Sequence, residues 1–200
     1  MSTRYDIHHR PVSPTTTSVA TQARRGIRFG LFAVLVVGVR RRHLGAVVNA
    51  VLALLATQLP GLLERRYDVE LQPWQHLYAD TAMLTHAIGM LGPYDDVWWW
   101  DHLTHTHSAT LLGGLVHTIA RRRNRNPRPR VLAVVILVGV IWEILEYLIH
   151  TTADLLNLEP ILVTYGEQDT LLDLCFDLLG ATLVLALGDR LLQNVIEPRD

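Results

Sequence analysis

Lysine is absent from this chain, and all 18 of its basic residues are arginine. Charge as a whole is scarce, because Asp, Glu, Lys and Arg make up 18% of the residues, against about 25% in soluble domains. Half of the residues are hydrophobic and the mean hydropathy is +0.21. A chain of 200 residues with this balance is predicted to be an integral membrane protein of one domain.

Other absences exclude several classes of function. The single cysteine, Cys175, lies in an apolar run and permits no internal disulfide. The chain has no P-loop, no dinucleotide-binding glycine pattern, no CxxC pair and no GxSxG turn. Six arginines fall within residues 121–130, but this is a short loop between apolar runs and the net charge is −1. Nucleic-acid binding is therefore not expected.

Apolar runs of membrane-spanning length set the predicted architecture, because a helix needs about 20 apolar residues to cross the hydrocarbon. The predicted spans are Gly26–Val39, Leu44–Leu63, Leu71–Leu91, His102–Ala120, Val131–Ile149 and Asp169–Leu192. The first is short and could instead lie at the interface, and the third carries several polar residues. We therefore predict an all-α, polytopic transmembrane helical bundle of five to six spans.

The remaining segments divide the chain. We expect a disordered polar tail over 1–25, a transmembrane helical domain over 26–193 and a C-terminal tail over 194–200. Arginine-rich loops favour the cytoplasm, which places Arg121–Arg130 inside a multi-pass protein of the cell membrane. Glu64–Arg66 agrees with this orientation, whereas Arg40–Arg42 falls outside and disagrees.

Titratable residues of three predicted spans meet in one membrane layer, on the side opposite the 121–130 loop. The fourth span starts with Asp101 and, one turn later, His105. The fifth ends with Glu143 and Glu146, and the sixth starts with Asp169, Asp173 and Asp177. Spacings of three or four residues place each group on one helix face. His102 and His150 are expected at the interface, and His107 on the other face of its helix.

No arginine lies between Arg66 and Arg121 or between Arg130 and Arg190, so none of these spans supplies a cationic partner. Three explanations stay open: protonated carboxyls, a watery cavity, or bound metal cations. Carboxylate and imidazole ligands suit Zn, Fe or Mn, and carboxylates alone suit Mg or Ca. Asp101 and Asp169 could also be helix N-caps, and His105 a hydrogen bond between helices. The candidate ligands of a divalent metal ion are Asp101, His105, Glu143, Glu146, Asp169 and Asp173.

The three motifs together resemble the YjdF-like family of bacterial and archaeal inner-membrane proteins over about Leu71–Leu192. They are Asp101-x-x-x-His105, Glu143-x-x-Glu146-Tyr147 and Gly166 with Asp169-x-x-x-Asp173 and Gly180-Ala181. A more distant similarity is to the VanZ-like membrane proteins. Residues 167–169 read Glu-Gln-Asp where YjdF-like proteins tend to have Gln-Gly-Asp. The resemblance implies these site residues and no established activity.

Three functions fit the sequence. A metal-dependent membrane enzyme would act on a lipid, a lipid-linked sugar or another amphiphile at the outer leaflet. A proton- or cation-coupled transporter would use the same residues as a relay. A structural or assembly protein would use them to lock its helices together. The predicted partners are the lipid bilayer, an amphiphilic substrate and, optionally, further copies of the chain; no catalytic residue or organic cofactor is assigned.

Overall fold

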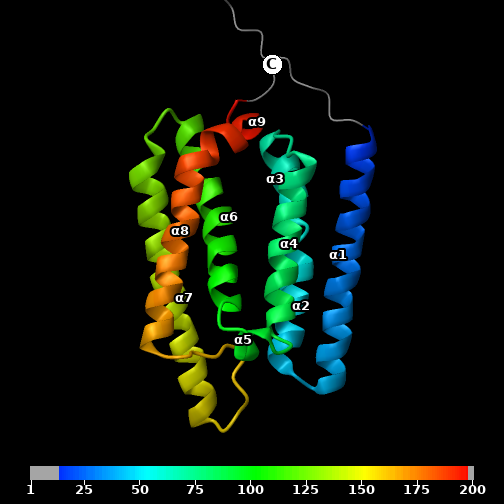
Figure 1. Cartoon of the computed structure of the whole chain (residues 1–200), viewed down its shortest axis with the longest axis vertical. Helices are drawn as coiled ribbons and strands as arrows, with labels where there is room; N and C mark the ends of the chain where they lie inside the picture. Colours follow the sequence, from blue (N-terminus) through cyan, green and yellow to red (C-terminus); the bar gives the residue numbers. More distant parts are fainter. Residues whose placement is uncertain (1–13, 198–200) are drawn as a thin grey trace, which may run out of the picture.

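The computed structural model describes residues 14–197, and every regular element in that part of the chain is a helix (Figure 1). In chain order the helices are α1 (Pro14–Arg41), α2 (Leu44–Ala56), α3 (Leu59–Tyr67), α4 (Pro73–Gly89), α5 (Pro93–Asp96), α6 (Trp100–Arg122), α7 (Pro127–Leu155), α8 (Glu167–Leu191) and α9 (Gln193–Ile196). The all-α prediction is confirmed for these residues.

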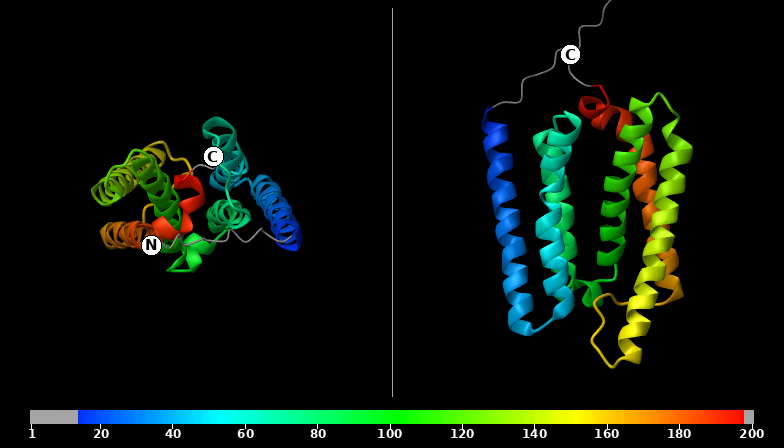
Figure 2. Two further views of the ribbon diagram at one scale, coloured as in Figure 1. Left: turned by 90° about the horizontal axis from the view of Figure 1, so that it is seen from above. Right: turned by 180° about the vertical axis from the view of Figure 1, so that it is seen from behind.

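The long helices form two groups of three that stand side by side (Figures 1 and 2). Helices α1, α2 and α4 contact one another, and so do α6, α7 and α8. Contacts between α4 and α6 join the groups along a seam. Since successive helices alternate in direction, the starts of α6 and α8 and the end of α7 lie at one end of the bundle (Figure 1). The α6–α7 loop lies at the opposite end.

Three helices within the described residues are long and apolar enough to cross a membrane: Leu44–Tyr67, which joins α2 and α3, then α7 and α8. The most apolar window of α7 has a mean hydropathy of 2.3, yet only 11% of it is buried in the protein. Large apolar side chains such as Leu137 and Leu148 face outward. This arrangement suits lipid rather than water. Helices α1, α4 and α6 run beside these three and carry more polar residues, so five to six spans stays a prediction.

Both predicted tails differ from the structure. Helix α1 begins at Pro14 and runs to Arg41, so residues 14–25 are helical and Gly26 is not a boundary. A helical turn at Gln193–Ile196 likewise occupies the start of the expected tail over 194–200. The rest of these two segments, 1–13 and 198–200, lies outside the described residues. A polar composition favours disorder, but the structure gives this segment a tertiary contact at Arg24, in the third turn of α1.

This contact is an ion pair inside the first group of helices. Arg24 Nε on α1 donates to Asp80 Oδ2 on α4 at 2.8 Å, and the Asp80 side chain is fully buried. From the sequence, no arginine is expected to pair with the polar residues of the spans, because Arg24 lies in the segment expected to be disordered. The pair supplies that missing charge for Asp80 and joins α1 to α4.

Replacing Arg24 with glutamine should lower the free energy of unfolding in detergent by about 3 kcal/mol, because Asp80 would stay buried without its partner. Exposed Arg25 provides the matched control, and Arg25→Gln should change stability by less than about 0.5 kcal/mol. Adding Asp80→Asn to Arg24→Gln removes the uncompensated charge and should restore much of the loss. Equilibrium unfolding measures all three variants, and a double variant no more stable than Arg24→Gln would contradict the electrostatic cause.

Candidate functional site

The candidate site begins at the tryptophan run that precedes α6. Trp98 is 78% exposed and Trp99 is 44% exposed, as expected of an aromatic belt at headgroup level. Trp100 instead donates its indole N–H to the backbone oxygen of Thr85 on α4, at 3.1 Å. The third tryptophan therefore fixes the start of α6 against α4. Asp101, for which an N-cap role was left open, lies inside the first helical turn, because the N-cap is Trp99.

Close packing of α6 against α8 assembles the polar cluster. A Cβ atom on Gly180 would lie 2.7 Å from Ala109 Cβ and 2.8 Å from the backbone oxygen of Thr106. Only a residue without a side chain permits this approach. The contact brings the histidines of α6 within hydrogen-bond reach of the aspartates of α8. Helix α8 itself starts after Gly166, whose φ of +106° is a conformation that favours glycine.

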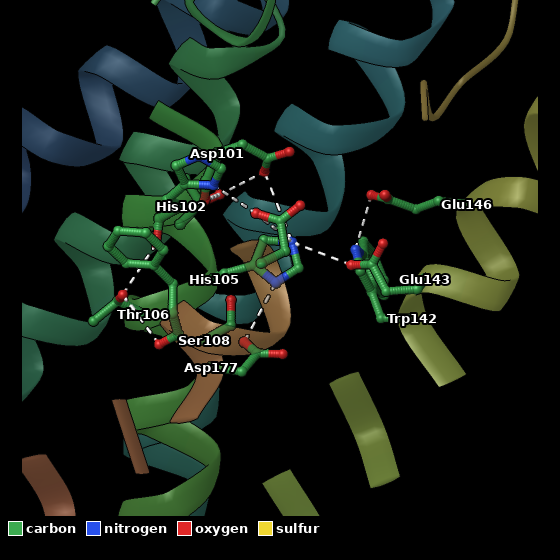
Figure 3. A network of polar contacts seen from close by, with 12 residues as sticks. Asp101, His102, His105, Thr106, Ser108, Trp142, Glu143, Glu146 and Asp177 are labelled. Carbon is green, nitrogen blue, oxygen red and sulfur yellow. Dashed lines mark hydrogen bonds and ion pairs between the residues drawn. The ribbon is translucent and has the colours of Figure 1, made fainter. Parts of the chain in front are cut away.

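His105 lies at the centre of the cluster, among carboxylates from three helices (Figure 3). Its Nδ1 is 3.3 Å from Asp177 Oδ1 on α8, a hydrogen bond that the imidazole N–H donates. Its Nε2 is 3.8 Å from Asp101 Oδ1, 3.8 Å from Glu143 Oε1 and 4.0 Å from Asp173 Oδ1. These three separations exceed hydrogen-bond length. One ring nitrogen is thus paired, and the other faces three acidic oxygens.

His102 forms the second connection between α6 and α8. Its side chain is 3% exposed and its Nδ1 lies 2.8 Å from Asp173 Oδ1. The ring stacks on Phe176 with centroids 4.8 Å apart. His102, Asp169 and Asp173 each offer one atom within 4.8 Å of the others, as do Asp101, His105 and Asp173. Asp173 therefore belongs to both groups.

The two glutamates of α7 differ in their surroundings (Figure 3). The Glu143 side chain is 10% exposed, and its Oε1 points toward His105 with no hydrogen-bond partner among the described residues. Glu146 accepts a hydrogen bond from Trp142 Nε1 at 2.9 Å. Glu146 lies beside a cavity that Asp101 also lines, rather than against His105.

A chain of hydrogen bonds leads away from Asp101 toward α4. Thr104 Oγ1 is 3.2 Å from Asp101 Oδ1, and the Tyr94 hydroxyl is 3.4 Å from Thr104 Oγ1. Tyr94 also lies 2.7 Å from His86 Nδ1, and His86 Nε2 is 3.2 Å from Ser108 Oγ. Four hydrogen bonds thus connect Ser108 to the carboxylate of Asp101.

Two tyrosines outside the helical spans border this region as hydrogen-bond donors. Burial raises the pKa of Tyr94, and burial together with the neighbouring Asp95 raises the pKa of Tyr165. Tyr165 donates to Asp95 Oδ1 at 2.7 Å, which attaches the α7–α8 connection to α5. Both phenols therefore keep their protons at neutral pH.

Two cavities reach the cluster. A cavity of about 220 Å³ extends from Asp101 and Glu146 to the end of the bundle at Tyr94 and Tyr165. A second, of about 310 Å³, touches His105 and is lined otherwise mostly by apolar residues. These apolar lining residues are Ala109, Leu112, Val135 and Val138. His86 and Trp142 line both cavities, so a polar space and an apolar space meet beside the cluster.

The structure brings three of the six predicted ligands, Asp101, Glu143 and Asp173, around the Nε2 atom of a fourth, His105. The other two, Asp169 and Glu146, lie beside that group. Like Asp101, Asp169 is inside the first turn of its helix rather than at the N-cap. His107 faces away, edge-on to Tyr78 at 5.5 Å between ring centroids.

Sequence reasoning missed two members of the cluster. It placed His102 at the interface, although the i, i+3 spacing to His105 was a signal that both share a face. It grouped Asp177 with Asp169 and Asp173 on one face of the sixth span but left Asp177 out of the candidate ligands. Both side chains are almost fully buried and bond across the α6–α8 contact.

Substituting alanine for Gly180 should destabilise the protein by about 1–3 kcal/mol, because the nearby backbone of α6 would have to move. The same substitution at Gly61, where no atom lies within 4 Å of an added Cβ, should leave stability unchanged or slightly raised. Thermal unfolding in detergent compares the two variants. Equal effects at both positions would show that the close approach of α6 and α8 is not needed.

Comparison with known proteins places the chain in a family. It is similar to an uncharacterized protein of Thermotoga maritima, with 27% identity over 133 residues, or 60% of this chain. The match spans 65% of that relative's length, just under two thirds. No solved structure matches the chain. The family model for predicted membrane proteins called DUF2238 matches residues 23–194. The chain therefore belongs to the DUF2238 family of predicted membrane proteins.

Proposed function

We propose that the cluster around His105 binds a divalent metal ion. The observation that carries the proposal is that the two ring nitrogens of His105 have different neighbours. Nδ1 lies within hydrogen-bond distance of Asp177, and a neutral imidazole that donates there would turn its Nε2 lone pair toward Asp101, Glu143 and Asp173. A carboxylate behind a ligating histidine is the usual support of a metal-bound imidazole.

Distances support this assignment. A tetrahedral metal ion with ligand bonds of about 2.1 Å separates its ligand atoms by about 3.4 Å. The separations of 3.8–4.0 Å from His105 Nε2 to the three carboxylate oxygens are a few tenths of an ångström wider. They are too long for hydrogen bonds and close to what a bound ion would require. Asp101, His105 and Asp173 each offer an atom within 4.8 Å of the other two, and the side chain of Glu143 would have to move toward this group to bind the same ion.

The unpartnered oxygen of Glu143 supports the proposal independently. A polar atom buried without a hydrogen bond costs free energy, and the Oε1 atom of Glu143 is such an atom in a side chain that is nine-tenths buried. A cation between this oxygen and His105 would supply the missing partner. It would also offset the repulsion among Asp101, Glu143 and Asp173, which no arginine neutralises.

The proposed ion and the two cavities together indicate a reaction class. An ion held by the His105 cluster would supply Lewis acidity toward an ester or phosphoryl oxygen, and Glu146 beside it would accept the proton of the attacking water and return it to the leaving oxygen. The apolar cavity beside His105 suits a hydrocarbon chain, and the polar cavity beside Glu146 suits a headgroup. We therefore propose a metal-dependent membrane enzyme that acts on a lipid or lipid-linked substrate.

A second candidate is a helix lock without catalysis. The buried pairs His102–Asp173 and His105–Asp177 both connect α6 to α8, as such a lock requires. On the basis of the three motifs, we also propose that the chain is related to the YjdF-like family. The more distant similarity to the VanZ-like proteins gains no support from the comparisons.

Metal analysis of the detergent-purified protein separates the two functions. The wild type should carry close to one divalent ion per chain, and His105→Ala and Glu143→Gln should lower this content at least tenfold. Two variants serve as controls. His107→Ala, on the same helix but facing Tyr78, should keep the metal. Glu146→Gln should also keep it while losing any hydrolysis of lipid esters or phosphates.

Other results would favour the helix lock or overturn the metal assignment. A wild type that takes up no Zn, Mn, Fe, Mg or Ca, together with a His102→Ala variant of lower unfolding temperature, would favour the helix lock. Metal bound equally by wild type and His105→Ala would place the ion elsewhere and overturn the assignment.

The arginine distribution supports an orientation in the membrane. Arg65, Arg66 and the 121–130 loop lie at one end of the bundle, and Arg40–Arg42 at the other (Figure 1). The larger group favours the cytoplasm. We propose a multi-pass protein of the cell membrane with the 121–130 loop inside and the His105 cluster toward the outer face.

Reporter fusions test this orientation in cells. Green fluorescent protein fused after residue 200 should fluoresce, because α9 lies at the same end as the 121–130 loop (Figure 1). Alkaline phosphatase inserted at Asn157, in the α7–α8 connection, should be active because that connection would be outside. Expression levels of both fusions are matched by immunoblotting. The reverse pattern of activities would invert the orientation.

A further inference from the structure

A crevice of about 420 Å³ lies on the seam between the two helix groups, at the end opposite the His105 cluster. This volume is within the range of about 300–1,000 Å³ typical of ligand sites. Its walls come from α3 and α4 on one side, from α6 on the other, and from the C-terminal residues Leu192 and Val195. The crevice plays no part in the proposed chemistry, and a ligand bound there would not require the metal.

The crevice changes from apolar to basic along its length. Leu63, Leu111 and Leu115 are among its apolar lining residues, and Arg122 and Arg123 lie where α6 ends. Arg122 also lines a neighbouring polar hollow of about 1,040 Å³, together with Arg125 and Arg128. An apolar space therefore leads directly to a group of guanidinium groups.

An apolar crevice that ends at arginines fits an amphiphile with a negatively charged headgroup. At the end of a membrane-spanning helix, arginines lie at the level of lipid phosphates. Leu115 and Ile119 line the crevice and are 45% and 44% exposed, so its wall is accessible from the lipid side. Arg121 is not counted among the arginines available to a headgroup, because its side chain pairs with Asp189.

We propose that the crevice binds an anionic phospholipid, with an acyl chain between α4 and α6 and the phosphate at Arg122 and Arg123. The lipid completes the packing of the seam, where α4–α6 contacts join the two groups. The arginine charge at one end selects an anionic lipid over a neutral one, and the mainly apolar walls, which also include Gln75, Thr110 and Thr118, hold an acyl chain. A second copy of the chain would instead need a partner surface that matches both features.

Native mass spectrometry of the full-length protein in detergent tests the proposal. Phosphatidylglycerol and phosphatidylcholine of identical chain length are added separately, and the lipid-bound fraction is followed against concentration. Wild type should bind one phosphatidylglycerol well before it binds phosphatidylcholine. Each arginine near an anionic headgroup contributes about fivefold in affinity, so Arg122→Gln/Arg123→Gln should weaken phosphatidylglycerol binding about 25-fold.

Two further variants separate the crevice from general surface charge. Arg65→Gln/Arg66→Gln removes two exposed charges at the same end outside the crevice, and should retain binding. Gly114→Leu adds apolar side chain into the crevice, where the nearest side-chain atom to an added Cβ is Leu192 Cδ1 at 3.6 Å. It should exclude both lipids while the protein remains folded by circular dichroism.

Three outcomes would overturn the proposal. Equal binding of the two lipids by wild type would remove the selection by charge. Equal losses in the two double-arginine variants would assign the effect to the surface as a whole. A dimer that carries no lipid, and that Gly114→Leu converts to a monomer, would identify a second copy of the chain as the occupant.

Discussion

Buried carboxylates at membrane depth are the constraint on which this structure depends, because each one needs a compensating charge or proton. The chain meets the need differently in its two helix groups. In the first, Arg24 neutralises Asp80 with one ion pair between α1 and α4. In the second, histidines contact aspartates across α6 and α8, and Glu143 lies 3.8 Å from His105, beyond hydrogen-bond length. The first group thus pairs its buried carboxylate with an arginine, whereas the second has only histidines to pair with several carboxylates.

The sequence predicted this difference only in part, and the reason is physical. Helical spacing determines which residues share a face, so the grouping of Asp101 with His105 and of Asp169 with Asp173 could be read directly. The neighbour of each face depends on tertiary packing. The α6–α8 approach at Gly180 decided that His102 turns inward, and no local pattern encodes that approach. The helical extension of α1 to Pro14 was missed for the same reason, since Arg24 gains its partner only in the folded bundle.

The seam between the helix groups gives the molecule its second organising feature. Near the α6 start, His86 of α4 and His105 of α6 border the cavities of the cluster. Near the α6 end, Ala79 and Leu115 line the lipid crevice between the same two helices. Because α4–α6 contacts join the groups, a change in the width of the seam would alter both spaces.

Neighbouring glutamates on α7 show how one helix can serve two purposes. Glu143 and Glu146 are one turn apart, and both border the same polar region. Glu143 points at His105 and has an oxygen with no hydrogen bond, as a ligand awaiting a cation would. Glu146 is held by Trp142 beside the open cavity, where a substrate or a water molecule would arrive. If both had faced His105, their mutual repulsion would have been greater. In the proposed site, the one-turn separation would let one carboxylate bind the ion while the other accepts a proton.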